Sequence, residues 1–383
     1  MVIPATPDGA FPNYYQHTDV EFIFRQLAAG ESCALVGIGS VGKSNLMQFL
    51  TRADVKERYL GVDRAPYYVM VLLNPHQLIR PQKQVLEMTG ESWPGYEIML
   101  NRLRRTLAVM IHEGIVPDGR DEQGDVVERI AERYNLLFDT HPLLTQTGIR
   151  QLEDAVTEVL RLDRRMRIVF MFDEFEEFIN LPAYFFQSLR GIRDDYKQRV
   201  MYVTASRFSL PELVAQHKPE PKDVGIMEGF VELFHGFTHY ISRLDTQSAR
   251  ASIERLERRY NARLQPNLER SLMYTTGRHS GLLRRGFRTA IRIYDPSAVS
   301  DDTLMNLLLQ DRGMIEECQS IFDSLSEREQ QTLRQIVNNQ PVDESSDALN
   351  TLTDKKLIAK TRDNPPRPVL TIPVFAVFIS QKV

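Results

Sequence analysis

The sequence predicts an α/β fold built on a parallel β-sheet, followed by a small helical domain and a C-terminal domain of helices and a β-hairpin. Three observations predict it: a glycine-rich loop between a strand and a helix, a later buried strand that ends in two acids, and a change to arginine-rich helical sequence after Asp245. Strands that alternate with helices favour a parallel sheet. We expect domains at 1–244, 245–300 and 301–383, with an insertion at about 112–147 in the first.

The glycine-rich loop is Gly37–Ser44, which matches the phosphate-loop spacing G-x-x-x-x-G-K-[ST] without substitution. An apolar strand precedes it and an amphipathic helix follows. In such a loop, backbone N–H groups form an anion nest and the helix N-terminus adds positive potential. Lys43 would bridge the outer phosphates, and Ser44 would ligate Mg²⁺. The sequence therefore predicts a P-loop NTPase that binds ATP or ADP, with contacts from Gly37, Gly39, Ser40, Val41, Gly42, Lys43, Ser44 and Asn45.

The second diagnostic segment, Arg167–Phe175, contains an apolar strand that ends in Asp173 and Glu174. A strand buried on both faces, with carboxylates at its C-terminal tip, places acids where open α/β sheets bind ligands. This pattern is typical of a Walker B element. Asp173 would hold Mg²⁺ through water, and Glu174 would polarise the attacking water. Together with Lys43, these residues predict a Mg²⁺-dependent ATPase of low turnover.

Two later segments extend the predicted sheet. Val200–Val203 is a third apolar strand, and the polar residues that follow, from Thr204 to Arg207, are typical of a sensor of the γ-phosphate. With Tyr67–Leu73, a β-rich apolar segment that Asn74-Pro75 terminates, Phe237–Leu244 brings the predicted strands to five.

The composition is that of an ordinary globular protein, with 42 % hydrophobic and 26 % charged residues among 383. Only two cysteines are present, Cys33 and Cys318, so a disulfide framework is excluded and we expect an intracellular, cytoplasmic protein. No secretory signal is visible, and no apolar run approaches the roughly 20 residues that a membrane span needs. A net charge of −4 gives no general attraction to nucleic acid, so any DNA contact would be local.

The two C-terminal parts are distinguished by charge and by capping signals. Between Arg243 and Arg292 the sequence has 12 arginines, no lysine and 4 acids, and helices near 246–261, 265–276 and 280–294 fit a helical lid. Further on, Ser326–Glu329 has the capping-box spacing that opens a helix. A second helix and two short strands follow it, which is the order of a winged helix.

These features together resemble the AAA+/STAND class of ATPases, in the branch that links origin-recognition-type initiators to NB-ARC and NACHT signalling switches. The resemblance covers essentially residues 15–380. The segment Thr276–Arg284 narrows the resemblance to one branch of the class, because this segment is similar to the Gly-Gly-His-Pro-Gly-Leu-Leu lid motif of prokaryotic STAND-like proteins. The resemblance implies a five-stranded sheet of order 5-1-4-3-2, with the nucleotide between sheet and lid.

The resemblance also implies roles for single residues. Arg207 would be the STAND-type sensor of the γ-phosphate, with Thr204 as the AAA+-type alternative, and Arg284 would act from the lid as sensor 2. Tyr14 and Tyr15 stand where this family often contacts adenine, and a place in the core suits them equally. An arginine finger that acts on a neighbouring subunit would come from Arg190, Arg193 or Arg199.

Three functions fit these predictions. The leading hypothesis is an ATP-driven switch whose nucleotide state controls homo-oligomer assembly or docking of separate effector or sensor chains. The second, less favoured, is a DNA-binding initiator or transposition-type ATPase that reads duplex with the winged helix. The third is a non-hydrolysing regulatory scaffold that binds protein partners. Positive charge for DNA would come from Lys355, Lys356, Lys360, Arg362 and Arg367, which nearby acids dilute.

Overall fold

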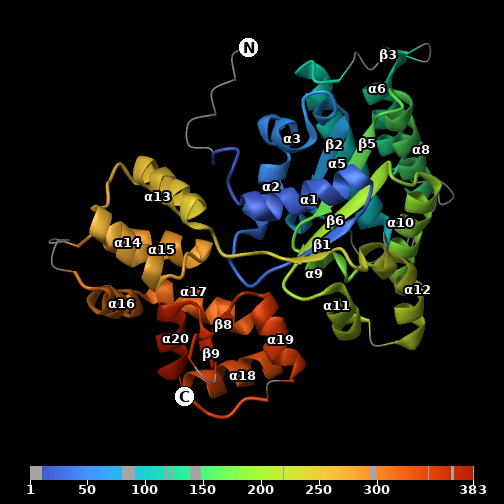
Figure 1. The fold of residues 1–383 in the computed structure, drawn as a ribbon. Helices are drawn as coiled ribbons and strands as arrows, with labels where there is room; N and C mark the ends of the chain where they lie inside the picture. Colours follow the sequence, from blue (N-terminus) through green and yellow to red (C-terminus); the bar gives the residue numbers. More distant parts are fainter. Residues whose placement is uncertain are drawn as a thin grey trace. The chain divides into compact units, whose positions relative to one another are not determined.

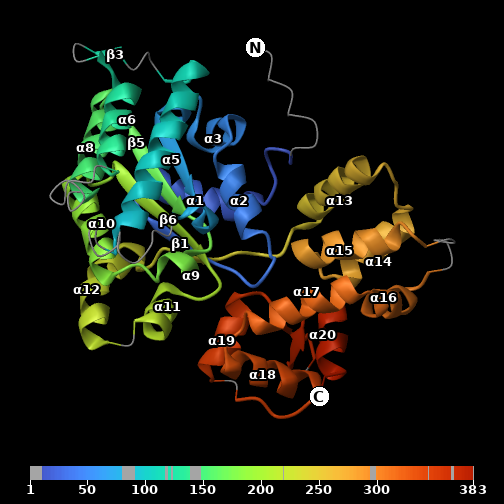
Figure 2. The same ribbon diagram turned by 180° about the vertical axis from the view of Figure 1, so that it is seen from behind.

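The computed structural model describes residues 11–79, 91–116, 120–121, 124–138, 148–218, 220–293, 299–343, 345–363 and 366–382. It divides into two compact units, whose elements are labelled in Figures 1 and 2. We call Val20–Leu35 with Ser44–His239 the core unit, and Met1–Asp19 with Val36–Lys43 and Tyr240–Val383 the lid unit. The glycine-rich loop therefore belongs to the same compact unit as the lid helices.

The central sheet has five strands in the order β2-β5-β6-β1-β7. Numbered along the chain, these strands lie in the order 2-3-4-1-5, so the predicted order 5-1-4-3-2 is confirmed. Strand β5 pairs in parallel with β2 on one side and with β6 on the other, and Phe172 lies opposite Leu73 and Thr204. The strands are β1 (Cys33–Val36), β2 (Tyr68–Leu73), β5 (Arg167–Phe172), β6 (Val200–Ser206) and β7 (Thr238–Tyr240).

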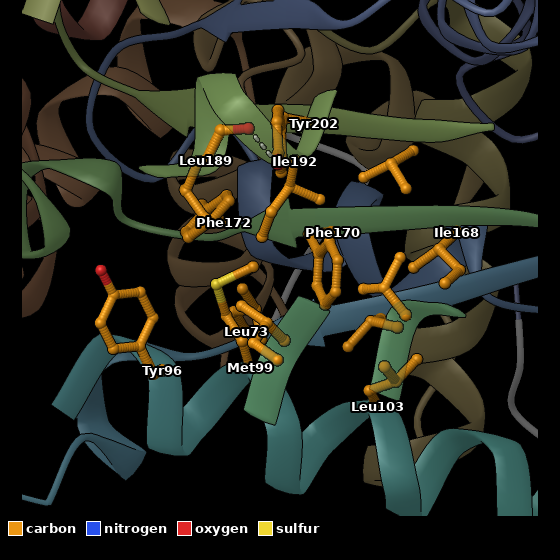
Figure 3. Close-up of a cluster of buried hydrophobic side chains, with 14 of the residues drawn as sticks. Leu73, Tyr96, Met99, Leu103, Ile168, Phe170, Phe172, Leu189, Ile192 and Tyr202 are labelled. Atoms are coloured by element: carbon orange, nitrogen blue, oxygen red, sulfur yellow. Dashed lines mark hydrogen bonds between the residues drawn. The ribbon is translucent and has the colours of Figure 1, made fainter. Parts of the chain in front are cut away.

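One face of the sheet carries the main hydrophobic core, shown in Figure 3. Phe170 and Phe172 are fully buried and alternate along β5 with residues that point to the other face. The Tyr202 hydroxyl donates to the Leu189 carbonyl over 2.7 Å, so its one polar atom is paired inside the core. Burying each such side chain stabilises the fold by about 1.5–3 kcal/mol. This core holds the C-terminal ends of β5 and β6 in fixed register.

Helices of the core unit surround the sheet and supply the partners of this core. The longest, α5 (Trp93–His112), packs on β2 and on α6 and α8. The other helices that the structure describes in this unit are α1 (His17–Ala29), α2 (Lys43–Leu50), α3 (Ala53–Leu60), α6 (Val126–Leu136), α8 (Gly148–Arg161), α9 (Phe175–Phe178), α10 (Ala183–Asp195), α11 (Leu210–His217) and α12 (Pro221–Val231), with short 3-10 turns at Ala65–Tyr67, Pro75–Gln77 and Glu232–Phe234.

The predicted insertion at 112–147 is described in part, since 117–119, 122–123 and 139–147 lie outside the described residues. Two short strands, β3 (Arg120–Asp121) and β4 (Gly124–Asp125), pair antiparallel before α6. Ile130 of α6 is fully buried in the main core, and Arg129 forms an ion pair of 2.7 Å with Glu158 of α8. Helix α6 is thus an integral part of the core packing.

The lid unit contains the three predicted lid helices, α13 (Thr246–Tyr260), α14 (Pro266–Thr275) and α15 (Ser280–Ala290). Asp245 caps α13 by accepting the Ser248 N–H over 2.8 Å. Two helices that the sequence pattern did not predict follow, α16 (Asp301–Gln310) and α17 (Arg312–Asp323).

The C-terminal part begins with α18 (Glu327–Val337), where the predicted capping box of Ser326 and Glu329 is formed. Helix α19 (Asp347–Asp354), the antiparallel strands β8 (Ile358–Lys360) and β9 (Pro368–Leu370), and helix α20 (Pro373–Ser380) complete the chain. The winged helix stays an interpretation of this order of elements. In the part of the chain that the structure describes, no helix is both long enough and apolar enough to cross a membrane.

Candidate functional site

The glycine-rich loop follows β1 and ends where α2 begins at Lys43. Ser40 and Gly42 have positive φ angles of 54° and 114°, which turn the backbone sharply. The Lys43 ammonium donates to the carbonyls of Gly37 (2.7 Å) and Ile38 (3.1 Å). The lysine that the sequence analysis assigns to the outer phosphates therefore donates hydrogen bonds to carbonyls of its own loop.

Two other segments of the lid unit hold this loop. The Gly39 N–H donates to Ser324 Oγ over 3.0 Å, and Ser324, in the turn after α17, is 1 % exposed. The Gly281 N–H, in the first turn of α15, donates to the Ser40 carbonyl over 3.0 Å. Sequence reasoning missed Ser324, which carries no motif and reaches the loop across 285 residues. An amide of the predicted anion nest is thus paired with a hydroxyl from the C-terminal part of the chain.

Gly281 lies in the lid motif and permits this close approach. A Cβ atom at this position would lie 2.2 Å from Glu317 Oε1 and 2.6 Å from the Ser40 Cβ. Glu317 is 7 % exposed, and its other carboxylate oxygen lies 3.6 Å from Arg285 Nε. Arg284, which the resemblance assigned to sensor 2, is exposed on α15. The neighbouring Arg285 is therefore the α15 arginine that contacts the surroundings of the loop.

His279 joins the lid motif to the loop from the other side. It is fully buried, and its Nδ1 accepts the Leu282 N–H at the start of α15 over 3.4 Å. Burial lowers the pKa of His279 to about 3, and the backbone of Gly39 opposes this shift while the Lys43 ammonium adds to it. The imidazole is consequently neutral at pH 7. The sequence identified this motif by resemblance, and the structure gives its histidine a capping role.

The acidic pair lies in the core unit at the C-terminal end of β5. Asp173 is 6 % exposed, and its N–H donates to the Leu73 carbonyl over 3.0 Å, which continues the sheet by one residue. Glu174 adopts the left-handed conformation, with φ 47° and ψ 56°. A non-glycine residue in this conformation stores about 1–2 kcal/mol of strain, and such strain clusters at functional sites.

His76 is a second residue that sequence reasoning missed. Its Nε2 lies 3.5 Å from Glu174 Oε2, and both side chains are exposed enough to reach a ligand, at 76 % and 45 %. It stands in the short turn after β2, where Asn74 Oδ1 accepts the His76 N–H over 2.9 Å. Only the pairing of β2 with β5 brings this turn beside the acidic pair.

The end of β6 carries the two predicted sensors. Thr204 is fully buried, and its Oγ1 has no hydrogen-bond partner within the described residues. Arg207 is half exposed, and its backbone N–H donates to Glu176 Oε1 over 2.5 Å, while its Nε lies 4.0 Å from the same oxygen. The side chain of Arg207 is therefore held only loosely, as an arginine that reads a ligand would need to be.

Ser44 and Asp173 are the residues that would hold Mg²⁺. Ser44 is exposed in the first turn of α2, and within the described residues the Asp173 carboxylate accepts only the Glu174 N–H, over 3.1 Å. Hydroxyl and carboxylate oxygens are the ligands that Mg²⁺ prefers. The donor set fits the predicted metal.

The three candidate finger arginines are all bonded within the core unit. Arg193 is 7 % exposed and donates to the Gly30 carbonyl over 2.7 Å. The Arg199 guanidinium donates to three backbone carbonyls. Arg190 forms ion pairs with Asp194 over 2.8 Å and with Glu232, in the 3-10 turn after α12, over 3.3 Å. Each of these side chains has a structural role in its own chain.

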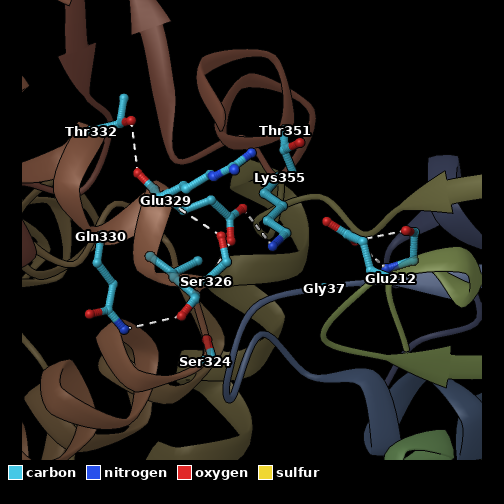
Figure 4. A network of polar contacts seen from close by, with 12 residues as sticks. Gly37, Glu212, Ser324, Ser326, Glu329, Gln330, Thr332, Thr351 and Lys355 are labelled. Carbon is cyan, nitrogen blue, oxygen red and sulfur yellow. Dashed lines mark hydrogen bonds and ion pairs between the residues drawn. The ribbon is translucent and has the colours of Figure 1, made fainter. Parts of the chain in front are cut away.

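One tyrosine of the predicted pair and one of the C-terminal lysines also take structural positions. Tyr15 is fully buried and stacks on Phe11 with ring centroids 3.9 Å apart. Lys355 is buried and forms an ion pair of 2.7 Å with Glu329, which Figure 4 shows beside the Ser326 cap. Since Lys355 is committed to this pair, the positive surface proposed for DNA loses one of its members.

Comparison with known proteins gives only distant likenesses. No protein-family model and no curated protein matches the chain. Among solved structures, Cdc6p from Pyrobaculum aerophilum is similar over 99 % of this chain and 97 % of its own, with 12 % identity and a TM-score of 0.36. A structure of Drosophila ORC bound to AT-rich DNA and Cdc6 is similar over 96 % and 94 %, with 12 % identity and a TM-score of 0.27. Because both TM-scores are below 0.5, neither likeness bears on activity.

Proposed function

We propose that this chain is an ATP-binding and slowly hydrolysing molecular switch of the AAA+/STAND type, which acts in the cytoplasm. Its nucleotide state would control assembly with further copies or docking of separate protein partners. The observation that carries this proposal is the hydrogen bond from the Gly39 N–H to Ser324 Oγ. A phosphate oxygen in the loop and the Ser324 hydroxyl compete for the same amide. Nucleotide binding is thereby coupled to the position of the turn between α17 and α18.

The lid motif extends this coupling. The Gly281 N–H bond to the Ser40 carbonyl and the buried His279 both join the loop to α15. A loop that rearranges around a phosphate changes the partners of these groups as well. The lid and the C-terminal elements can therefore respond as one body to the nucleotide, which is what an assembly switch requires.

Hydrolysis is assigned to the residues at the strand ends. Lys43 exchanges its two loop carbonyls for phosphate oxygens when nucleotide binds. Glu174 accepts a proton from the attacking water as the water oxygen bonds to the γ-phosphorus and the bond to the β-phosphate oxygen breaks. Ser44 and Asp173 would hold Mg²⁺, which would supply charge neutralisation at the phosphates. Thr204 and Arg207 are the proposed readers of the γ-phosphate.

The catalytic assignment is tested by Mg²⁺-dependent ATP turnover of the wild type and of Glu174→Gln, with Glu177→Gln on the neighbouring turn as the matched control. We expect slow turnover that Glu174→Gln abolishes and Glu177→Gln preserves. Wild-type turnover in Glu174→Gln would show that another group activates the water. Turnover absent from the wild type, with ADP retained through purification, would favour the non-hydrolysing scaffold.

The switch role is tested by light scattering of the purified protein with ADP, with a non-hydrolysable ATP analogue, and with added duplex DNA. We expect the mass to change with the triphosphate analogue alone. Assembly that requires duplex would favour the DNA-binding initiator instead. That alternative is less supported, because Lys355 is buried in an ion pair and the exposed Lys356 and Arg362 have acids nearby in sequence.

A further inference from the structure

A cavity of about 400 Å³ lies in the core unit along the open edge of β2, the outermost strand of the sheet. Its walls come from the end of α2, the start of α3 and the C-terminal half of α5. Of the lining residues, Met70 of β2 and Lys56 of α3 are buried, and Arg105 and Val109 of α5 are exposed. This volume falls within the range of about 300–1,000 Å³ that is usual for small-molecule sites.

The charged groups that line this cavity are predominantly positive. Lys56, Arg102 and Arg105 contribute three cations, and Glu113 is the one carboxylate. Within the described residues, neither arginine forms an ion pair. Arg105 donates only to the Asn101 side chain, over 3.1 Å. Two neighbouring guanidinium groups therefore line this cavity with Glu113 as the one carboxylate beside them, and the charge of Arg105 is also felt by Glu97 outside the cavity.

The burial of these cations makes their positive charge costly. Burial lowers the pKa of Lys56 to about 8, and the charges of Glu57 and then of Glu113 only partly oppose the shift. The pKa of Arg102 is lowered by burial first and by the charge of Arg105 second. Clusters of like charge that perturb one another occur preferentially where a ligand of opposite charge binds.

A structural role accounts for only part of this arrangement. Lys56 Nζ donates to the Tyr68 carbonyl over 3.2 Å, and Arg102 Nε donates to the Leu72 carbonyl over 3.2 Å. These two bonds satisfy acceptors on the open edge of β2. Each of these bonds uses one donor of its side chain. The other guanidinium N–H groups of Arg102, and the terminal N–H groups of Arg105, remain to bind a ligand.

We propose that this cavity is a second anion site, distinct from the glycine-rich loop, which binds a small phosphomonoester. The paired guanidiniums of Arg102 and Arg105 would grip the phosphate oxygens, since their planar forks match phosphate geometry. The hydroxyl of Thr106, on the same helix as the two arginines, also lines the cavity and can donate to the ligand. The start of α3, which has no side-chain cap, adds backbone N–H donors at Ala53.

The apolar part of the cavity indicates that the phosphate carries a small organic body. Met70, Leu72, Val109, Met110 and Ile115 form this part. The occupant would contact the C-terminal end of α2, whose N-terminal end carries Lys43. The proposed site stands independently of the proposed function, because its residues take no part in the glycine-rich loop.

The test is isothermal titration calorimetry of the full chain carrying Lys43→Ala, which weakens phosphate binding at the loop, in a phosphate-free buffer. Ribose 5-phosphate, inorganic phosphate and ribose are titrated into this protein. We expect saturable binding of ribose 5-phosphate and none of ribose. Adding Arg105→Ala should weaken binding by about tenfold or more, because it removes charge-assisted hydrogen bonds. Adding Arg164→Ala, an exposed arginine of the same unit outside the cavity, should leave binding unchanged.

Arg105 is a suitable probe because its side chain is exposed and has one partner, so its loss should leave the circular dichroism spectrum unchanged. Inorganic phosphate that binds as tightly as ribose 5-phosphate would support the site and identify free phosphate as its ligand. Absence of saturable binding of both phosphates would overturn the proposal. Binding that is equal with and without Arg105→Ala, or weakened equally by Arg164→Ala, would overturn it too. None of these outcomes depends on whether the loop binds ATP.

Discussion

Replacing Ser324 by alanine tests the competition between the C-terminal turn and the nucleotide most directly. The substitution removes the Oγ that accepts the Gly39 N–H over 3.0 Å, and with it the bond of 2.6 Å that this hydroxyl donates to the Ile321 carbonyl. Ser324 is 1 % exposed, so water does not readily replace the lost acceptor. The nucleotide-free protein then carries an unpaired N–H in its loop.

The magnitude follows from the cost of that unpaired amide. A buried donor that loses its partner costs about 1–3 kcal/mol. In the nucleotide-bound state a phosphate oxygen takes the amide of Gly39, so the substitution costs nothing at that bond. The difference between the two states favours nucleotide by the same amount. We therefore expect Ser324→Ala to tighten nucleotide binding by about 5- to 150-fold and to lower the thermal stability of the nucleotide-free protein.

The assay is a calorimetric or fluorescence titration with ADP and with a non-hydrolysable ATP analogue. Ser320→Ala is the matched control, because Ser320 lies one turn earlier on α17 and is exposed. The affinity of the Ser320→Ala variant for nucleotide should equal that of the wild type. A Ser324→Ala protein that loses stability yet binds nucleotide no more tightly would refute the reasoning, since the bond would then be structural and not in competition with phosphate.

Two further predictions concern the lid motif. Gly281→Ala should lower the melting temperature, because the new Cβ would lie 2.2 Å from Glu317 Oε1. Gly225→Ala is the control and should not lower it, because nothing lies within 4 Å of a Cβ at that position. Equal melting temperatures of the two variants would mean that the loop and the lid separate easily. The pKa of His279 is about 3 in the folded chain and about 6.5 when unfolded, so its contribution to stability is complete above pH 6.5 and is lost as pH falls toward 3, by up to about 1.4 kcal/mol per pH unit. Urea unfolding of His279→Asn, which keeps a cap acceptor for the Leu282 N–H, should show a shallower loss of stability between pH 6.5 and 4.5 than the wild type, and equal slopes would contradict the assignment.

The local features of this protein were readable from its sequence. The continuous apolar run Ile168–Phe172 is typical of a strand buried on both faces, and it lies in strand β5. The capping box at Ser326 depends on residues three positions apart, and it formed as predicted. The Gly37–Ser44 spacing likewise reports a loop whose chemistry lies within eight residues. Each of these patterns depends on residues that are close in sequence, so it can be read without knowing the tertiary structure.

The order of the five strands was predicted only because the motifs resemble a known class. Nothing in the spacing of β1 and β6 says that they are neighbours, since order depends on how the connecting helices pack. Helices α16 and α17 were not predicted, although each has buried apolar residues and a side-chain N-cap, Ser300 for α16 and Asp311 for α17. Burial against the rest of the lid unit stabilises them more than their own propensity does.

By itself, then, the sequence determined a glycine-rich loop between a strand and a helix, an apolar strand that ends in two acids, and the capping box that opens α18. The tertiary structure decided which groups meet: Ser324 with Gly39 across 285 residues, His76 with Glu174 across two strands, and Lys355 with Glu329 in a buried pair. It also separated Arg285, held against Glu317, from the exposed Arg284 one position before it. The physical reason is that hydrogen bonds and ion pairs depend on distances in space, and only packing of the whole unit sets those distances.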